Sequence, residues 1–103
     1  MMVKERLPYD ALVALCQRWG VTELSLFGSA LRDDFASESD VDLLVSFAPD
    51  CRMGLKFFEL EAELEELFGR KVDLISRSGL TYTRNSEFRD EVQRTAQVIY
   101  AAP

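Results

Sequence analysis

The sequence predicts an α/β domain, a β-sheet with helices on at least one of its faces. Two observations support this prediction. Helical and strand-like segments alternate along the chain, and the segment 41–47, VDLLVSF, has the apolar, β-branched composition of a strand buried inside a sheet. With 103 residues, 48% of them hydrophobic, the chain is expected to form one domain over residues 1–103 around a single modest core.

Two elements are expected at the start of the chain. A helix over residues 8–19 is indicated by apolar residues at helical spacing, with Pro8 suited to its first turn and Gly20 to its end. Cys16 lies on the apolar stripe of this helix and is expected in the core. The alternating pattern of residues 21–27 then predicts a strand.

Next come a helical turn, a loop and the buried strand. The short helical turn is expected over residues 30–35 and the polar loop over residues 36–39. The second strand, over residues 41–47, ends at a turn within residues 48–52. The most apolar strand is therefore the second along the chain.

The second half begins with the clearest helix of the sequence. It is expected over residues 53–68, where apolar residues fall on one face and glutamates fill much of the rest. Gly69 is placed to cap its end. Phe57 and Phe58 are adjacent, so one of them is expected to face away from the core.

Three further segments complete the expected order. A third strand is predicted over residues 71–75 and a loop over residues 76–79. The last helix is expected within residues 80–96, and the tail 97–100 either adds a strand or packs against the domain. Phe88 and Val92 are expected on the apolar face of that helix.

The composition excludes several classes of function. A net charge of −6 argues against a general nucleic-acid binder and against docking on an anionic membrane surface, because both need basic residues. The acidic balance is compatible with bound divalent cations or with a basic partner protein. The chain has no histidine, which excludes histidine as an acid, base or metal ligand.

The expected location is the cytoplasm. Cys16 and Cys51 are far apart and form no CxxC motif, so they are expected to be free thiols in a reducing compartment. No apolar run approaches the roughly 18 residues that a membrane span needs. The first residues also lack the apolar stretch of a signal peptide.

One segment, LFGSALRDDFASESDVDLLVSF over residues 26–47, carries candidate chemistry. Asp40 and Asp42 are two positions apart at the start of a strand, so both carboxylates are expected on one face. Neighbouring carboxylates raise each other's pKa unless a cation lies between them, and oxygen-rich sites of this kind suit Mg²⁺ with substrate phosphates. A pair of such ions about 3.5–4 Å apart is the usual arrangement for phosphoryl or nucleotidyl transfer.

Asp73 is a candidate third carboxylate. It lies between Val72 and Leu74 in an otherwise apolar strand. If this strand neighbours the strand of Asp42, Asp73 joins the same site. Its expected role is to help hold the metal and to accept the proton of an attacking hydroxyl, since no histidine is present to do so.

Gly28 and Ser29 form a candidate phosphate site. A glycine at a strand end lets a ligand approach the backbone, and a serine that opens a helix can cap it beside N–H groups that attract phosphate. Arg32 can add a positive charge, or it is an exposed helix residue. A basic group can likewise bind triphosphate or an acidic partner surface, or be solvated; its members are Arg70, Lys71, Arg77, Arg84 and Arg89.

Each feature taken singly has an ordinary structural explanation. A lone Asp-x-Asp is commonly a solvated strand edge or turn, a lone Gly-Ser is a turn, and Asp73 alone is a residue at a sheet edge. The joint pattern favours the functional interpretation. It requires a strand, Gly-Ser, a helical turn, Asp-x-Asp before an apolar strand, and an aspartate in the next strand.

This pattern resembles the GSx10DxD signature of the nucleotidyltransferase superfamily that includes DNA polymerase β. In length and layout the chain is similar to the minimal nucleotidyltransferases, from the LFGS strand end through SDVDLLV to ELFGRKVDLI. The resemblance implies a small mixed sheet and two Mg²⁺ ions bound by Asp40 and Asp42, with Asp73 as the third carboxylate. It also implies that Gly28 and Ser29 hold the nucleotide phosphates.

The resemblance also implies an activity and a partner. The expected reaction is transfer of AMP from ATP, or of another nucleoside monophosphate, to a hydroxyl group. Minimal nucleotidyltransferases act as antitoxins of HEPN-type ribonuclease toxins, and some transfer AMP to a toxin tyrosine. A hetero-oligomer with such a toxin is therefore expected, with no direct binding of nucleic acid and no membrane; a homodimer stays open.

The alternative is a binding module that keeps the fold and neutralises its partner by contact alone. The presence of all three carboxylates argues against this alternative. The loop sequence GSALRD argues mildly for it, because relatives often read GSRARG there and because Asp33 and Asp34 lie beside the phosphate site.

Overall fold

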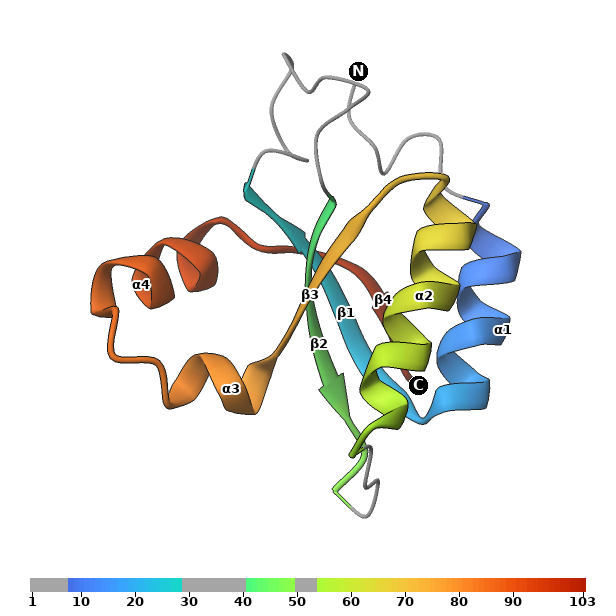
Figure 1. Ribbon diagram of the computed structural model, residues 1–103, viewed down its shortest axis with the longest axis horizontal. Helices are drawn as coiled ribbons and strands as arrows, with labels where there is room; N and C mark the ends of the chain where they lie inside the picture. The colour runs from blue at the N-terminus through green and yellow to red at the C-terminus, as the bar shows by residue number, and fades with distance from the viewer. Residues whose placement is uncertain (1–7, 29–40, 50–53) are drawn as a thin grey trace.

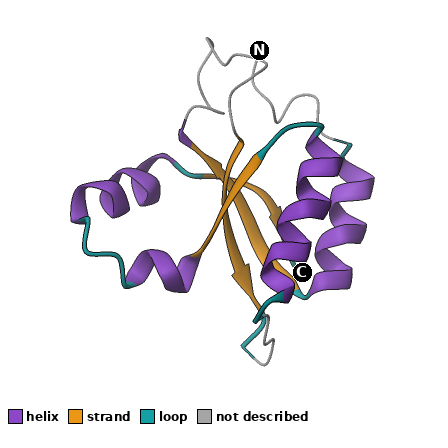
Figure 2. Cartoon of the chain, viewed as in Figure 1, coloured by secondary structure: helices purple, strands orange, loops and turns teal. Residues whose placement is uncertain are grey.

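The computed structural model describes residues 8–28, 41–49 and 54–103 (Figures 1 and 2). Its elements are α1 (Tyr9–Trp19), β1 (Val21–Phe27), β2 (Val41–Phe47), α2 (Lys56–Phe68), β3 (Val72–Ser76), α3 (Arg77–Thr81), α4 (Ser86–Thr95) and β4 (Gln97–Ala101). The predicted helical turn over residues 30–35 and the loop over residues 36–39 lie outside the described residues.

The strands form one mixed sheet in the order β3-β2-β1-β4. β1 is antiparallel to both β2 and β4, whereas β2 and β3 run parallel. α1 and α2 cover one face of this sheet, and α3 and α4 lie on the other (Figure 2). The expected α/β class and the mixed sheet are therefore confirmed, with helices on both faces.

The larger core fills the space between the sheet and the pair α1 and α2. Leu12 and Cys16 of α1 and Leu60 of α2 are fully buried, and Leu64 is 1% exposed. Burying a leucine side chain stabilises the fold by roughly 1.5–3 kcal/mol. The strand residues of this core are Val21, Leu24, Leu26, Val41, Leu43, Val45, Val72, Leu74 and Tyr100.

A smaller core lies under α3 and α4. Phe27 and Leu44 from the sheet pack with Leu80 of α3 and Val92 of α4. Phe88 packs edge-to-face on Phe27, with 6.2 Å between the ring centroids. The predicted apolar face of the last helix is thus confirmed, and the tail forms the strand β4.

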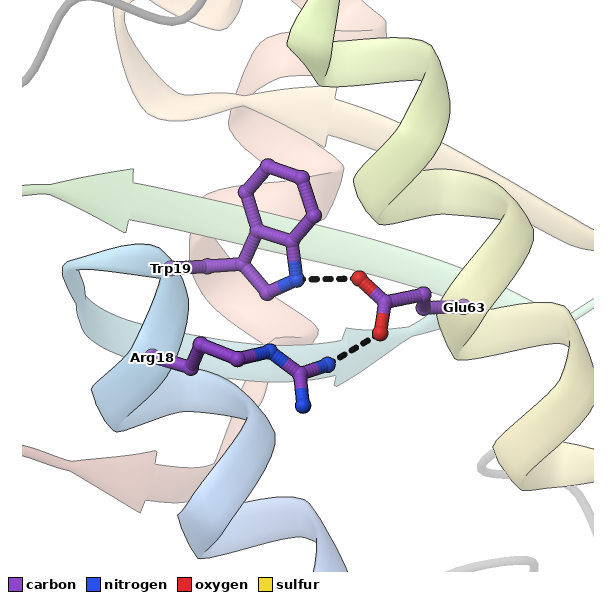
Figure 3. Close-up of polar contacts among 3 residues, drawn as sticks. All are labelled: Arg18, Trp19 and Glu63. Carbon is purple, nitrogen blue, oxygen red and sulfur yellow. Dashed lines mark hydrogen bonds and ion pairs between the residues drawn. The ribbon is translucent and has the colours of Figure 1, made fainter.

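A polar contact joins α1 to α2 on the outside of the larger core (Figure 3). The carboxylate of Glu63 accepts hydrogen bonds from the Trp19 indole N–H and from the Arg18 guanidinium. Glu63 thereby fixes the two helices relative to each other at one end of α1. One glutamate of the acidic helix is therefore structural.

Several predicted bounds differ from the structure, and one predicted loop is a helix. α2 begins at Lys56, later than the predicted residue 53, because Gly54 has a φ of +51°, outside the helical region. The predicted strand 71–75 is Val72–Ser76. The predicted loop 76–79 is wrong, because α3 begins at Arg77.

The predicted glycine caps and the predicted orientation of one phenylalanine away from the core are confirmed. Gly20 and Gly69 end α1 and α2 in the left-handed conformation. Phe57 packs against the larger core, while Phe58 is 65% exposed. In the part of the chain that is described, no helix is both long and apolar enough to cross a membrane.

Candidate functional site

The strand pairing brings two of the predicted carboxylates together. In the parallel pair β2 and β3, Asp42 is the register partner of Asp73. Neighbouring strands lie about 4.7–4.9 Å apart, so the two side chains start from adjacent positions. The condition set by the sequence, that the strand of Asp73 neighbours the strand of Asp42, is met.

Both carboxylates lie on the same face of the sheet. The flanking residues Leu43 and Leu74 belong to the larger core, and successive side chains of a strand alternate between faces. Asp42 and Asp73 therefore point to the face that carries α3 and α4. Asp42 is half-buried and Asp73 is exposed, so Asp73 is accessible from solvent.

Gly28 completes the described part of the site. It follows β1 directly, and the last residue of that strand, Phe27, pairs with Asp42. Gly28 has a φ of +68°, and a Cβ built on it would lie 2.6 Å from Oδ2 of Asp42. The carboxylate of Asp42 thus occupies the space that any side chain at position 28 would need.

The remaining predicted site residues are Asp40, Ser29 and Arg32, which lie outside the described residues. Cys51 lies outside them as well. The structure therefore brings together Asp42, Asp73 and Gly28, at the end of the sheet where β1 ends and where β2 and β3 begin.

The described donors suit a hard divalent cation. Within the described ranges no group of three or more acidic or cysteine side chains is gathered for a metal ion, so Asp42 and Asp73 form a pair there. Mg²⁺ is typically held by one or two carboxylates together with waters and substrate phosphates. Two carboxylates on adjacent strands, one of them exposed, fit that requirement.

Arg77 lies away from this site. Its guanidinium donates to Oγ of Ser46 at 3.1 Å and to Oε1 of Glu23 at 3.0 Å. Glu23 and Ser46 pair at the opposite end of the β1–β2 ladder from Phe27 and Asp42. The hypothesis that Arg77 binds triphosphate beside the aspartates is therefore not supported; Arg77 fastens α3 to the sheet.

Cys16 is a core residue without access to the site. Its side chain is fully buried and forms no disulfide. Burial raises the pKa of the Cys16 thiol from 9.0 to about 11. The thiol is therefore protonated at neutral pH, which rules out a role as nucleophile.

Two glutamates beside the site were not expected from the sequence. Glu65 and Glu61 of α2 accept hydrogen bonds from the backbone N–H groups of Val72 and Leu74, on either side of Asp73. In the sequence these residues are part of an acidic helix face. Their spacing of four residues was the signal that they share one side of that helix.

Comparison with known proteins gives a family. The sequence model of the nucleotidyltransferase domain family matches residues 10–99 of this chain. A protein adenylyltransferase MntA of Thermococcus cleftensis is 47% identical over 66 residues, which is 64% of this chain and 66% of that protein. The match thus spans just under two thirds of the length of this relative.

Solved structures share the fold. A chain assigned as a minimal nucleotidyltransferase superposes with a TM-score of 0.70 at 33% identity, over 94% of this chain and 95% of that one. A chain from the complex of the tri-AMPylated HEPN toxin of Shewanella oneidensis with an MNT antitoxin gives 0.60 at 18% identity, over 91% of this chain and 70% of that chain. The chain described here belongs to the nucleotidyltransferase domain family.

Proposed function

We propose that this chain is a Mg²⁺-dependent nucleotidyltransferase that moves AMP from ATP to a hydroxyl group of a protein. The observation that supports the proposal most strongly is the pairing of Asp42 with Asp73 on one sheet face, with Gly28 against Asp42. The adenylyltransferase relative supports AMP as the transferred group. For domain organisation, we propose one nucleotidyltransferase domain over residues 1–103.

Each residue has a proposed role in the transfer. Asp42 and Asp73, together with Asp40, hold Mg²⁺, which when bound supplies positive charge to the phosphates and to the attacking oxygen. Gly28 and Ser29 bind the β and γ phosphates through the backbone, and Arg32 adds a positive charge there. The site thus works by positioning and by neutralising charge.

The proton and the leaving group can be followed through the step. The acceptor oxygen forms a bond to the α-phosphorus of ATP, and the bond from that phosphorus to the bridging α,β oxygen breaks. Pyrophosphate leaves with the electrons of that bond. The hydroxyl proton passes to the carboxylate of Asp73, whose exposure leaves it within reach of an incoming acceptor.

The proposed acceptor is a tyrosine of a HEPN-type toxin, with this chain as the antitoxin. The Shewanella oneidensis complex contains an AMPylated HEPN toxin and supports this choice of partner. AMP on such a tyrosine adds bulk and negative charge, which opposes binding of RNA. We place the pair in the cytoplasm.

The test is transfer from labelled ATP to a HEPN-type toxin encoded beside this chain. We expect label on the toxin with Mg²⁺ and none with EDTA. Label on neither protein, together with a stable complex that still neutralises the toxin, would favour the alternative of a binding module that acts by contact alone. The altered GSALRD loop is the feature that favours that alternative.

A further inference from the structure

The outer edge of β3 is covered by side chains of α2. β3 is the end strand of the sheet in the described part of the chain, with β2 on its inner side. Oε2 of Glu65 accepts from the Val72 N–H at 3.0 Å, and Oε2 of Glu61 accepts from the Leu74 N–H at 3.3 Å. Both of these amides, which point away from β2, therefore donate a hydrogen bond to a carboxylate.

The geometry of helix and strand makes this contact regular. Four residues of an α-helix rise about 6 Å and share a face, whereas two residues of a strand rise about 6.6 Å. Glu61 and Glu65 are therefore spaced like alternate amides of β3. The pairing also shows that α2 and β3 run in opposite directions, because the later glutamate meets the earlier amide.

Asp73 lies at the centre of this arrangement. Successive amides of a strand point to opposite sides, so the N–H of Asp73 points toward β2, as does the carbonyl of Lys71, which accepts from the Val41 N–H. Asp73 is thus held by β2 on one side, and its two neighbours are held by α2 on the other. Hydrogen bonds to a charged acceptor are stronger than neutral ones.

We propose that Glu61 and Glu65 are positioning residues, a pair of carboxylates that closes the edge of β3 and fixes Asp73 opposite Asp42. The proposal rests on the proposed function in one respect, the binding of a divalent cation by Asp73. The hold on β3 itself is independent of that function. The simpler alternative is that these glutamates only protect an edge strand from pairing with other chains.

Three double variants distinguish the loss of the hydrogen-bond acceptors that hold β3 from the loss of negative charge on α2. Glu61→Ala with Glu65→Ala removes both acceptors, whereas Glu61→Gln with Glu65→Gln removes the same charge and keeps an acceptor oxygen at each position. Glu59→Ala with Glu66→Ala is the control, since it removes two charges of the same helix that form no hydrogen bond with β3 among the described residues. Mn²⁺ serves as the probe, titrated by calorimetry with a non-hydrolysable ATP analogue.

We expect the alanine pair to weaken Mn²⁺ binding by about 10-fold or more, because loss of groups that orient a metal ligand costs 10–100-fold in affinity. The glutamine pair and the control are expected to stay close to each other and to the wild type. Equal Mn²⁺ affinity in the alanine and glutamine pairs would overturn the proposal. In that case, self-association of the alanine pair would identify edge protection as the role.

Hydrogen exchange keeps this test separate from the test of function. The Val72 and Leu74 amides are expected to exchange about 10-fold faster in the alanine pair but not in the glutamine pair. Unchanged exchange of these two amides in the alanine pair would contradict the proposal that Glu61 and Glu65 hold β3 in place. If the wild type binds no Mn²⁺ and transfers no AMP, the proposed function fails, while exchange still decides whether the glutamates hold the strand. If the double alanine variant does not fold, the single variant Glu65→Ala is used instead, and its Val72 amide is expected to exchange faster than in the wild type.

Discussion

At the scale of single residues, the contact between Gly28 and Asp42 has the sharpest consequence. Gly28 and Gly69 have φ values of +68° and +67°, so alanine at either position costs about 1 kcal/mol of stability through backbone strain. Only at Gly28 does the new Cβ also meet a carboxylate, 2.6 Å away, with nothing within 4 Å at Gly69. Gly28→Ala is therefore expected to lower AMP transfer at least about 10-fold beyond Gly69→Ala.

The two glycine variants are compared by urea unfolding and by transfer as a function of Mg²⁺ concentration. We expect the two variants to have similar unfolding free energies. Only Gly28→Ala is expected to need a higher Mg²⁺ concentration for transfer. Equal Mg²⁺ requirements would mean that Asp42 adjusts to the new methyl group without loss.

Cys16 gives a second prediction at this scale. Burial raises its pKa from 9.0 to about 11, so its contribution to stability is complete below pH 9 and is lost as the pH rises through 11. In a Cys51→Ser variant, Cys16 is expected to resist iodoacetamide at pH 8 until urea unfolds the chain, as followed by mass spectrometry. Rapid alkylation of the folded variant would contradict the burial of this thiol.

The sequence singles out the candidate site residues but does not predict how they contact each other. Asp42, Asp73 and Gly28 stand out because charge or glycine occurs where a strand pattern does not need it. The close approach of Gly28 to Asp42 depends on the pairing of β1 with β2. Register of this kind is decided by tertiary packing, which local patterns do not contain.

At the scale of elements, Glu63 joins α1 to α2 through two hydrogen bonds that contribute unequally to the free energy of unfolding. The Arg18 side chain is 61% exposed, so its ion pair contributes little, whereas the part-buried Trp19 N–H would lose its carboxylate partner. We expect Glu63→Ala to lower the free energy of unfolding by about 1–2 kcal/mol. Arg18→Ala is expected to cost less than about 0.5 kcal/mol.

Fluorescence reports this prediction directly, because Trp19 is the one tryptophan of the chain. Glu63→Ala is expected to change its emission and Arg18→Ala to leave it nearly unchanged. Equal losses of stability in the two variants would contradict the larger stabilisation that we assign to the hydrogen bond between Trp19 and Glu63.

α3 shows why some elements escape prediction. Its five residues, RSGLT, include glycine and serine, which have low helix propensity. Its helical turn is held instead by tertiary contacts: Leu80 is buried in the smaller core, and Arg77 donates to Ser46 and Glu23. By contrast, the long periodic segment of α2 was predicted correctly except at its start.

At the scale of the whole molecule, the topology explains why the candidate site residues lie together. β1 runs antiparallel to β2, so the end of β1 meets the start of β2, and the start of parallel β3 lies beside it. Gly28, Asp42 and Asp73 meet there although they are far apart in sequence. The alternation of elements predicts the α/β class, but strand order and direction depend on long-range pairing; the mixed sheet followed from the family resemblance.

The joint action of Asp42 and Asp73 in AMP transfer is the core of the proposed function. Its most direct test is the intact mass of the HEPN-type partner after incubation with ATP, Mg²⁺ and the wild type, Asp42→Asn or Asp73→Asn, with circular dichroism to check folding. We expect added AMP with the wild type and none with either folded variant. AMP added by both variants at the wild-type rate would contradict the claim.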